Sequence, residues 1–229
     1  MTPDSPTDPA PSGDVDLRLL PLAFFARPTV VVARDLLGKV LLTRLGGVLT
    51  GGRVVETEAY LGKDDPGSHA ATRGITRRNR VMYGPPGRAY VYFTYGNHHM
   101  LNVVTEHDGV AGAVLVRAIE PLFGLETMLA RRAGHVPEAP ARGPGCVAQA
   151  LGVDLSLNDT ELGGIIAIAD APPVDDDQIV TTGRIGLRQG YELPLRFYVR
   201  GNPHVSRASS GAAPERRGAH PRGDCYETE

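Results

Sequence analysis

The residues of this chain with the richest chemistry lie within one window, residues 54–102. Two glutamates, Glu56 and Glu58, come first, and arginines and tyrosines follow. The window holds five of the eight tyrosines, and residues 68–100 contain five arginines and no carboxylate. A basic, aromatic surface beside isolated carboxylates is suited to holding a polyanion, stacking on bases and acid–base chemistry. These residues favour an enzyme that acts on nucleic acid.

The arginines of this window are candidates for contact with the DNA backbone: Arg73, Arg77, Arg78, Arg80 and Arg88. The whole chain has 24 basic and 26 acidic residues, a net charge of −2, which by itself argues weakly against a nucleic-acid partner. Acidic residues concentrate in residues 1–16 and 170–177, segments expected at the periphery, so the average conceals a basic face. The distribution of charge alone does not exclude the alternative that these arginines are solvated and have no partner.

Strand alternation places Glu56 and Glu58 on one face and Thr57 on the other. A carboxylate pair on a strand surface is usually solvated, and that is one alternative. The other follows from apolar neighbours such as Val54, because an apolar setting raises the pKa of a carboxylate and makes it a competent base.

The same alternation puts Tyr90 and Tyr92 together, with Val91 and Phe93 expected to face the core. Two tyrosines on one face can simply cover the edge of a core. Tyr95 differs, because it ends the strand just before a turn, where a bulky aromatic is poorly placed to bury itself. Inserting such a side chain into a base stack distorts a duplex.

Metal and cofactor motifs are absent from the sequence. His98-His99 lacks an HExxH partner, and Cys146 and Cys225 have no CxxC or Cys/His ligand spacing. No P-loop, dinucleotide-binding loop or nucleophile elbow occurs. His69, in a small-residue loop, is expected to form a hydrogen bond rather than to titrate. We expect neither a metal nor a cofactor.

The composition and the two distant cysteines favour a cytoplasmic protein. No apolar run approaches the roughly 20 residues that span a bilayer, and the N-terminus is acidic and proline-rich rather than a secretory signal. We expect a disordered acidic tail at residues 1–17, one domain at residues 18–203 and a disordered tail at residues 204–229.

Hydrophobic alternation and turn residues predict an α+β fold, a single domain with a curved, mostly antiparallel sheet surrounded by helices. Strands that follow one another through tight turns, such as Gly46-Gly47, pair antiparallel. We expect strands at residues 39–45, 48–60, 88–95, 100–106, 113–119, 165–169, 179–185 and 195–199, and helices at residues 28–37, 122–132 and 146–151.

Several sequence blocks, in order, resemble the alkyladenine (3-methyladenine) DNA glycosylase family, and the chain is similar to a bacterial member. The resemblance extends over residues 20–203, and an ordered set of blocks is far more specific than any one of them. The blocks include Arg53-Val54-Val55-Glu56-Thr57-Glu58-Ala59-Tyr60-Leu61, Ser68-His69, Asn79-Arg80, Tyr90-Val91-Tyr92, Tyr95-Gly96, Asn102, Leu115-Val116-Arg117-Ala118, Gly143-Pro144, Arg184-Ile185-Gly186 and Leu195-Arg196-Phe197-Tyr198.

The resemblance implies a monofunctional glycosylase of base-excision repair that acts on double-stranded DNA containing damaged purines. Such an enzyme flips an alkylated or deaminated purine from the duplex and hydrolyses its N-glycosidic bond, leaving an abasic site. A monomer associated with the nucleoid of a bacterium is expected on the same resemblance. Glu58 matches the residue that activates the attacking water, and Arg117 the one that helps hold that water and the carboxylate. Tyr95 matches the residue that fills the vacated stack. Glu56 is expected to be much less important.

The resemblance also assigns a base pocket. Tyr60, His69 and Tyr92 match residues that sandwich and read the base, and Asn102 matches the one that hinders normal guanine at its exocyclic amino group. Where the family often has a lysine, this chain has Cys146, which leaves one phosphate or strand contact open.

Two other classes of protein remain as alternatives. A non-catalytic DNA-binding module could use the arginines and Tyr95 to bend or mark DNA, but a carboxylate such as Glu58 beside Tyr60 would oppose phosphate binding there. A small-molecule hydrolase would have no use for the basic stretch. The carboxylate argues against the DNA-binding module and the basic stretch argues against the small-molecule hydrolase, so both features favour an enzyme that acts on DNA.

Overall fold

A long strand, β2 (Val48–Tyr60), is the centre of the fold. One of its edges pairs first with β1 (Val40–Leu45) and then with β8 (Arg196–Val199), while the other edge pairs with β5 (Ala113–Phe123). The predicted hairpin of β1 and β2 is confirmed. The computed structural model describes residues 17–71, 74–94, 96–133 and 138–206.

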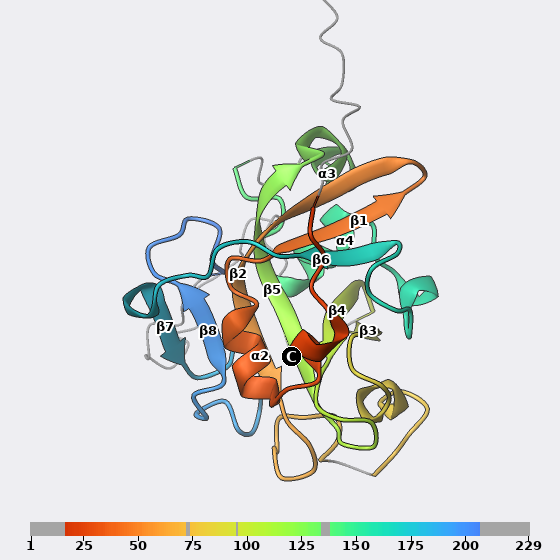
Figure 1. Ribbon diagram of the computed structural model, residues 1–229, viewed down its shortest axis with the longest axis vertical. Helices are drawn as coiled ribbons and strands as arrows, with labels where there is room; N and C mark the ends of the chain where they lie inside the picture. The colour runs from red at the N-terminus through yellow and green to blue at the C-terminus, as the bar shows by residue number, and fades with distance from the viewer. Residues whose placement is uncertain (1–16, 72–73, 95, 134–137, 207–229) are drawn as a thin grey trace, which may run out of the picture.

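The remaining strands extend this sheet on both sides (Figure 1). They are β3 (Ala89–Thr94), β4 (His98–Val104), β6 (Ile166–Ala169) and β7 (Ile179–Thr182). The order is β3-β4-β5-β2-β1-β6, with β8 between β2 and β7, and the strands pair antiparallel. The predicted α+β class with a curved antiparallel sheet is confirmed.

Helices cover the sheet, and α2 lies over β2 and β5 (Figure 1). The Thr57 hydroxyl of β2 donates a hydrogen bond to the Ala33 carbonyl of α2, at 2.7 Å. α4 packs against β4 and β5. The helices are α1 (Leu22–Phe25), α2 (Thr29–Asp35), α3 (Leu125–Arg131) and α4 (Pro144–Leu151), with 3₁₀ turns at Arg80–Tyr83, Leu155–Leu157 and Asp176–Gln178.

The alternation pattern of β3 predicted the wrong environment for Phe93. Phe93 is 42% exposed, whereas Val91 and Tyr90 are both buried. β3 is the last strand of the sheet, and each face of its first half is covered: Val91 joins the main core and Tyr90 a second cluster with Met82. This cover ends before residue 93, so the prediction that Phe93 faces the core is wrong.

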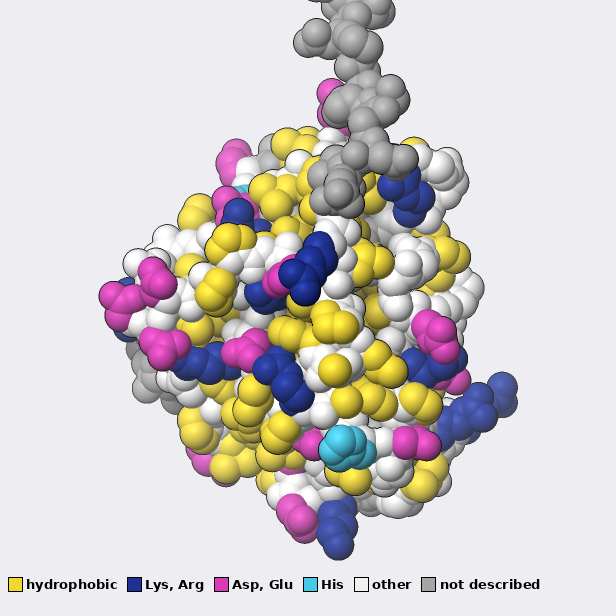
Figure 2. Space-filling view, in the orientation of Figure 1, with side chains coloured by type: hydrophobic (Ala, Val, Ile, Leu, Met, Phe, Trp, Pro, Cys, Tyr) yellow, Lys and Arg dark blue, Asp and Glu magenta, His cyan; other side chains and the backbone are white. Residues whose placement is uncertain are grey.

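The last described residue, Ser206, packs into the domain. The predicted boundary fell after residue 203, yet Ser206 is buried and bonds to Glu56 of β2. Within the described ranges no helix combines the length and apolarity needed to cross a membrane. Figure 2 shows the face that carries α2, where basic and acidic side chains are interspersed. This face therefore lacks the concentrated positive charge that phosphate binding uses.

Candidate active site

Both glutamates of β2 point into the protein and are completely buried. The register between β2 and β5 shifts there, with Glu56 opposite Ala118 and Thr57 opposite Val116, so Arg117 is an extra residue on β5. Such β-bulges redirect side chains next to active sites. The alternative of a solvated carboxylate pair is wrong.

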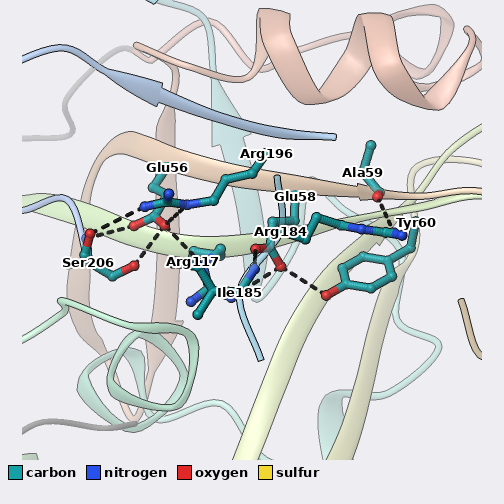
Figure 3. Close-up of polar contacts among 9 residues, drawn as sticks. All are labelled: Glu56, Glu58, Ala59, Tyr60, Arg117, Arg184, Ile185, Arg196 and Ser206. Carbon is teal, nitrogen blue, oxygen red and sulfur yellow. Dashed lines mark hydrogen bonds and ion pairs between the residues drawn. The ribbon is translucent and has the colours of Figure 1, made fainter. Parts of the chain in front are cut away.

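Arg117 joins the two carboxylates (Figure 3). Its Nε donates to Glu56 Oε1 at 3.0 Å, and its Nη1 donates to Glu58 Oε2 at 3.1 Å. Glu58 also accepts hydrogen bonds from the Tyr60 hydroxyl at 2.9 Å and from the Ile185 backbone N–H at 2.8 Å. The orientation of Glu58 is therefore fixed from three elements of the fold.

Glu56 has a different set of partners. Arg196 Nε donates to its Oε1 at 2.7 Å, and the backbone N–H and hydroxyl of Ser206 each donate to it at 2.7 Å. Burial alone would raise the pKa of Glu56, but the guanidinium groups of Arg117 and Arg196, with the Ser206 hydroxyl, outweigh burial and hold it below the usual value. The apolar neighbours in the sequence therefore do not decide the pKa of Glu56.

A second buried ion pair lies behind Tyr60. Arg184 donates through Nη2 to Asp65 Oδ1 at 2.5 Å and through Nη1 to Asp65 Oδ2 at 2.7 Å. Its Cζ lies 4.7 Å from the centre of the Tyr60 ring. Burial would raise the pKa of Asp65, but Arg184 and the backbone N–H groups of Leu61 and Gly67 lower it overall. The sequence analysis missed Asp65, because no local pattern links residues 119 positions apart.

The four predicted base-pocket residues line one cavity, although they come from different parts of the fold: Tyr60, His69, Tyr92 and Asn102. Glu58 is connected to this cavity through the Tyr60 hydroxyl. Sequence reasoning did not assign the other residues of its wall, which are Gly67, Met82, Tyr90, Thr94, Ala113, Gly186 and Leu187. Most of these are small or apolar, and such residues carry no chemical signal in a sequence.

The aromatic rings of the cavity contact one another. The ring centres of His69 and Tyr92 lie 4.7 Å apart at an interplanar angle of 77°, and those of Tyr90 and Tyr92 lie 5.3 Å apart. His69 Nδ1 forms a hydrogen bond of 3.0 Å with the Tyr90 hydroxyl, as expected for a non-titrating histidine. Burial, together with the charge of Arg78, lowers the pKa of His69 to about 4, so the ring is neutral at pH 7.

The side chain of Asn102 is fixed in the cavity wall. Its Nδ2 donates to the Tyr90 carbonyl at 3.0 Å and to the Met100 carbonyl at 3.4 Å. Because both bonds are to backbone of β3 and β4, the amide cannot turn without breaking contacts with the sheet. It therefore presents a constant shape to any occupant.

This arrangement has known relatives. The methylpurine-DNA glycosylase family matches residues 23–203. The chain belongs to this family. A relative from Methanoculleus marisnigri is 50% identical over 192 residues, covering 82% of this chain and 98% of the relative. Relatives from Chlorobaculum parvum (45% identical, 88% and 97% covered) and Carboxydothermus hydrogenoformans (47% identical, 82% and 99% covered) carry the same name, "Putative 3-methyladenine DNA glycosylase".

The arginines expected to contact DNA are not equivalent in this member of the methylpurine-DNA glycosylase family. Arg77 and Arg80 are exposed and form no ion pair with any described residue. Arg78 Cζ lies 5.0 Å from the centre of the Tyr92 ring, at the pocket. Arg88 is ion-paired with Asp159 and Glu161.

Two predicted residues of this glycosylase-family chain, Arg73 and Tyr95, lie outside the described residues. Among the residues that are described, no three histidine, cysteine, aspartate or glutamate side chains gather as metal ligands would. The described residues bring together a buried carboxylate, its arginine and an aromatic cavity.

Proposed function

We propose that this protein is a monofunctional DNA glycosylase that takes a damaged purine from duplex DNA into the cavity of Tyr60, His69, Tyr92 and Asn102, and hydrolyses its N-glycosidic bond. The observation that carries the proposal is Glu58, a completely buried carboxylate held beside an aromatic cavity. A protein that only binds DNA has no use for a buried charge at this position. Membership of the glycosylase family supports the same reaction class.

In the proposed reaction, Glu58 accepts a proton from a water molecule as its oxygen bonds to C1′ of the nucleotide. The bond from C1′ to the purine nitrogen breaks, and its electron pair leaves with the base. An abasic sugar remains in an intact strand. Arg117 holds one oxygen of Glu58, at 3.1 Å, so that the carboxylate keeps its direction. A positioned general base typically contributes about 10²–10⁴-fold to a rate.

The cavity supplies selectivity for alkylated or deaminated purines. Turning a base out of a duplex costs a few kcal/mol, and less when its pairing is already damaged. Stacking on aromatic rings returns about 1–3 kcal/mol per base, and a cationic alkylated purine gains further from the ring faces of Tyr60 and Tyr92. Asn102, fixed by its bonds to β3 and β4, opposes the exocyclic amino group of normal guanine.

The reaction is proposed to stop at the abasic site, because a strand-cleaving lyase needs an amine that forms a Schiff base with C1′. The only two lysines are poorly suited. Lys39 Nζ is bonded to Asp170 and to the Ala171 carbonyl, and Lys63 is exposed in a loop. Borohydride added during turnover should trap no covalent protein–DNA adduct. An adduct that disappears in Lys63→Ala would make the enzyme bifunctional.

The decisive experiment is single-turnover excision by Glu58→Gln on duplexes that carry 3-methyladenine, 7-methylguanine, hypoxanthine or ethenoadenine. The amide keeps the shape of the side chain but cannot accept the proton, so lesion binding should persist while excision falls by about 10²–10⁴-fold. Glu126→Gln, on the exposed surface of α3, is the matched control and should cleave normally. Retention of more than about a tenth of the wild-type rate by Glu58→Gln would contradict the general-base role.

A further inference from the structure

Arg117 divides its guanidinium between two carboxylates, and only one of them is the proposed base. Nε faces Glu56 and Nη1 faces Glu58, at 3.0 and 3.1 Å. Neither carboxylate lines the cavity, but Glu58 accepts a hydrogen bond from the lining residue Tyr60, whereas Glu56 is bonded to Arg117, Arg196 and Ser206. Besides the bond from Arg117, Glu56 accepts three further hydrogen bonds from described residues, one from Arg196 and two from Ser206, so it is the anchor of the network in Figure 3.

We propose that Glu56 is a positioning residue for base excision, acting through Arg117, and that Ser206 makes the C-terminal segment part of the active site. The inference rests on the proposed role of Glu58 as general base. It also reverses the sequence-based expectation that Glu56 is of minor importance.

Glu56 fixes the orientation of the Arg117 guanidinium group. The guanidinium group is a planar fork, so a bond at Nε fixes the plane in which its other N–H groups lie. Without the Glu56 carboxylate, Nε of Arg117 would be left unsatisfied in the interior, which is costly. The group would then turn to give two parallel bonds to Glu58, the strong arrangement for an arginine–carboxylate pair. Glu56 thus holds the plane of the Arg117 guanidinium in which Nη1 donates to Oε2 of Glu58.

Glu56 also affects the balance of charges around Glu58. The charged groups around Glu58 are Arg117 of β5, Glu56 of β2, Arg196 of β8 and Arg184, which follows β7, with the Tyr60 hydroxyl completing the set. Glu56 and Glu58 balance Arg117 and Arg196. Removing the charge of Glu56 leaves the positive charge of Arg117 less compensated, so that it acts more strongly on Glu58. The carboxylate of Glu58 then becomes a weaker proton acceptor in the reaction.

Ser206 lies three residues beyond the end of the family match at residue 203. Its N–H and its hydroxyl both donate to Glu56, and its carbonyl accepts a bond from Arg196 Nη2 at 3.3 Å. Ser206 therefore contacts both members of the Glu56–Arg196 pair. A residue at the C-terminal end of the domain is thereby linked to the proposed base, Glu58, through two intervening residues, Glu56 and Arg117.

The test is single-turnover excision of a good lesion substrate across a pH series. Glu56→Gln should lower the plateau rate by about 10²-fold, the scale of a misplacement near 1 Å. It should also move the acid limb of the profile to lower pH, while lesion binding stays close to wild type. Ser206→Ala removes one hydrogen bond and no charge. It should therefore lower the plateau rate and shift the acid limb in the same directions as Glu56→Gln, but by smaller amounts. Asp170→Asn, which breaks the Lys39 pair far from the cavity, should leave both unchanged.

A double variant separates positioning from simple charge imbalance. Breaking one side of a buried ion pair is destabilising in itself, and Glu56→Leu/Arg196→Leu restores neutrality while removing the oxygen that accepts from Arg117 Nε. The double variant should remain slow. Full recovery of its rate would overturn the inference, as would a wild-type plateau and acid limb in folded Glu56→Gln. If Glu56→Gln does not fold, Ser206→Ala decides, and a wild-type profile for it overturns the inference.

These outcomes are distinct from failure of the proposed function. An active Glu58→Gln enzyme would remove the general base and with it the reason to position Arg117. An inactive Glu58→Gln enzyme together with a wild-type Glu56→Gln enzyme would leave the proposed function intact and overturn only the role of Glu56.

Discussion

The buried network around Glu58 and the arginine stretch of residues 77–88 use the same kinds of side chain in opposite ways. The network gathers residues that are far apart in the sequence, and each buried carboxylate in it contacts an arginine. The stretch gathers neighbours in the sequence, yet Arg78 lies over Tyr92 while Arg88 is bound to Asp159. Closeness in sequence therefore did not define a functional unit, whereas closeness in the interior did.

Burial explains the difference in strength. Water and salt screen exposed charges, so exposed ion pairs contribute about 0–1 kcal/mol, whereas removing one partner of a buried pair leaves an uncompensated charge in the interior. We expect changes in the buried network to affect stability and chemistry strongly. Changes in the arginine stretch should mainly affect DNA binding.

The largest expected effect on stability is at Asp65. Asp65→Asn leaves the buried guanidinium of Arg184 without its counter-charge and should lower the free energy of unfolding by about 3–5 kcal/mol. Asp176→Asn is the control, because its pair with Arg34 is exposed and should contribute about 0–1 kcal/mol. Urea denaturation of both variants measures the contrast. Equal losses would remove the distinction between the buried and exposed regions.

The next effect concerns Tyr95, which lies between Thr94 of β3 and Gly96 and is outside the described residues. If its ring fills the vacated base stack, Tyr95→Ala should weaken the flipped state by up to the few kcal/mol that unstacking requires. A fluorescent base analogue at the lesion reports the flipping equilibrium directly. The same flipping amplitude in wild type and variant would exclude this role, and the chemistry at Glu58 should be unaffected in either case.

His69 should make the free energy of unfolding vary with pH. Its pKa is about 4 in the folded protein and near 6.5 in the unfolded chain, so between these values the unfolded chain binds a proton that the folded protein does not. Stability should therefore fall as the pH decreases from 6.5 to 4. His69→Gln should flatten this part of the profile, and His107→Gln, at an exposed position, should not. Calorimetry across that range measures both.

The smallest effects are expected in the arginine stretch. Arg77→Gln/Arg80→Gln should reduce the slope of log K against log salt by about 2, because each phosphate contact contributes about 0.9. Arg88→Gln should change the slope little, since this side chain is held by Asp159 and Glu161. Titrations of lesion-containing duplex at several salt concentrations give the slopes. A large change for Arg88→Gln would mean that its ion pairs open on DNA.

The positions of the strands along the chain were accessible from the sequence because they depend on local properties. Alternating apolar residues around Gly46-Gly47 predicted β1 and β2 within one residue of their observed bounds. Helix α3 was less well predicted: it was expected from residue 122 but begins at Leu125, because β5 continues to Phe123 and Gly124, with a φ of 66°, separates the two elements. A pattern of apolar residues alone does not distinguish the end of a strand from the start of a helix.

The sequence by itself determined which chemical groups this protein has: a pair of glutamates on one strand face, a set of tyrosines, and the blocks that indicate its family. Only the tertiary structure decided which of those groups meet. The bulge at Arg117 turns one guanidinium toward both Glu56 and Glu58, and Arg184 reaches Asp65 from a distant segment. Such pairs form because a buried charge must find its partner within the folded interior, and no local sequence rule specifies which residue that will be.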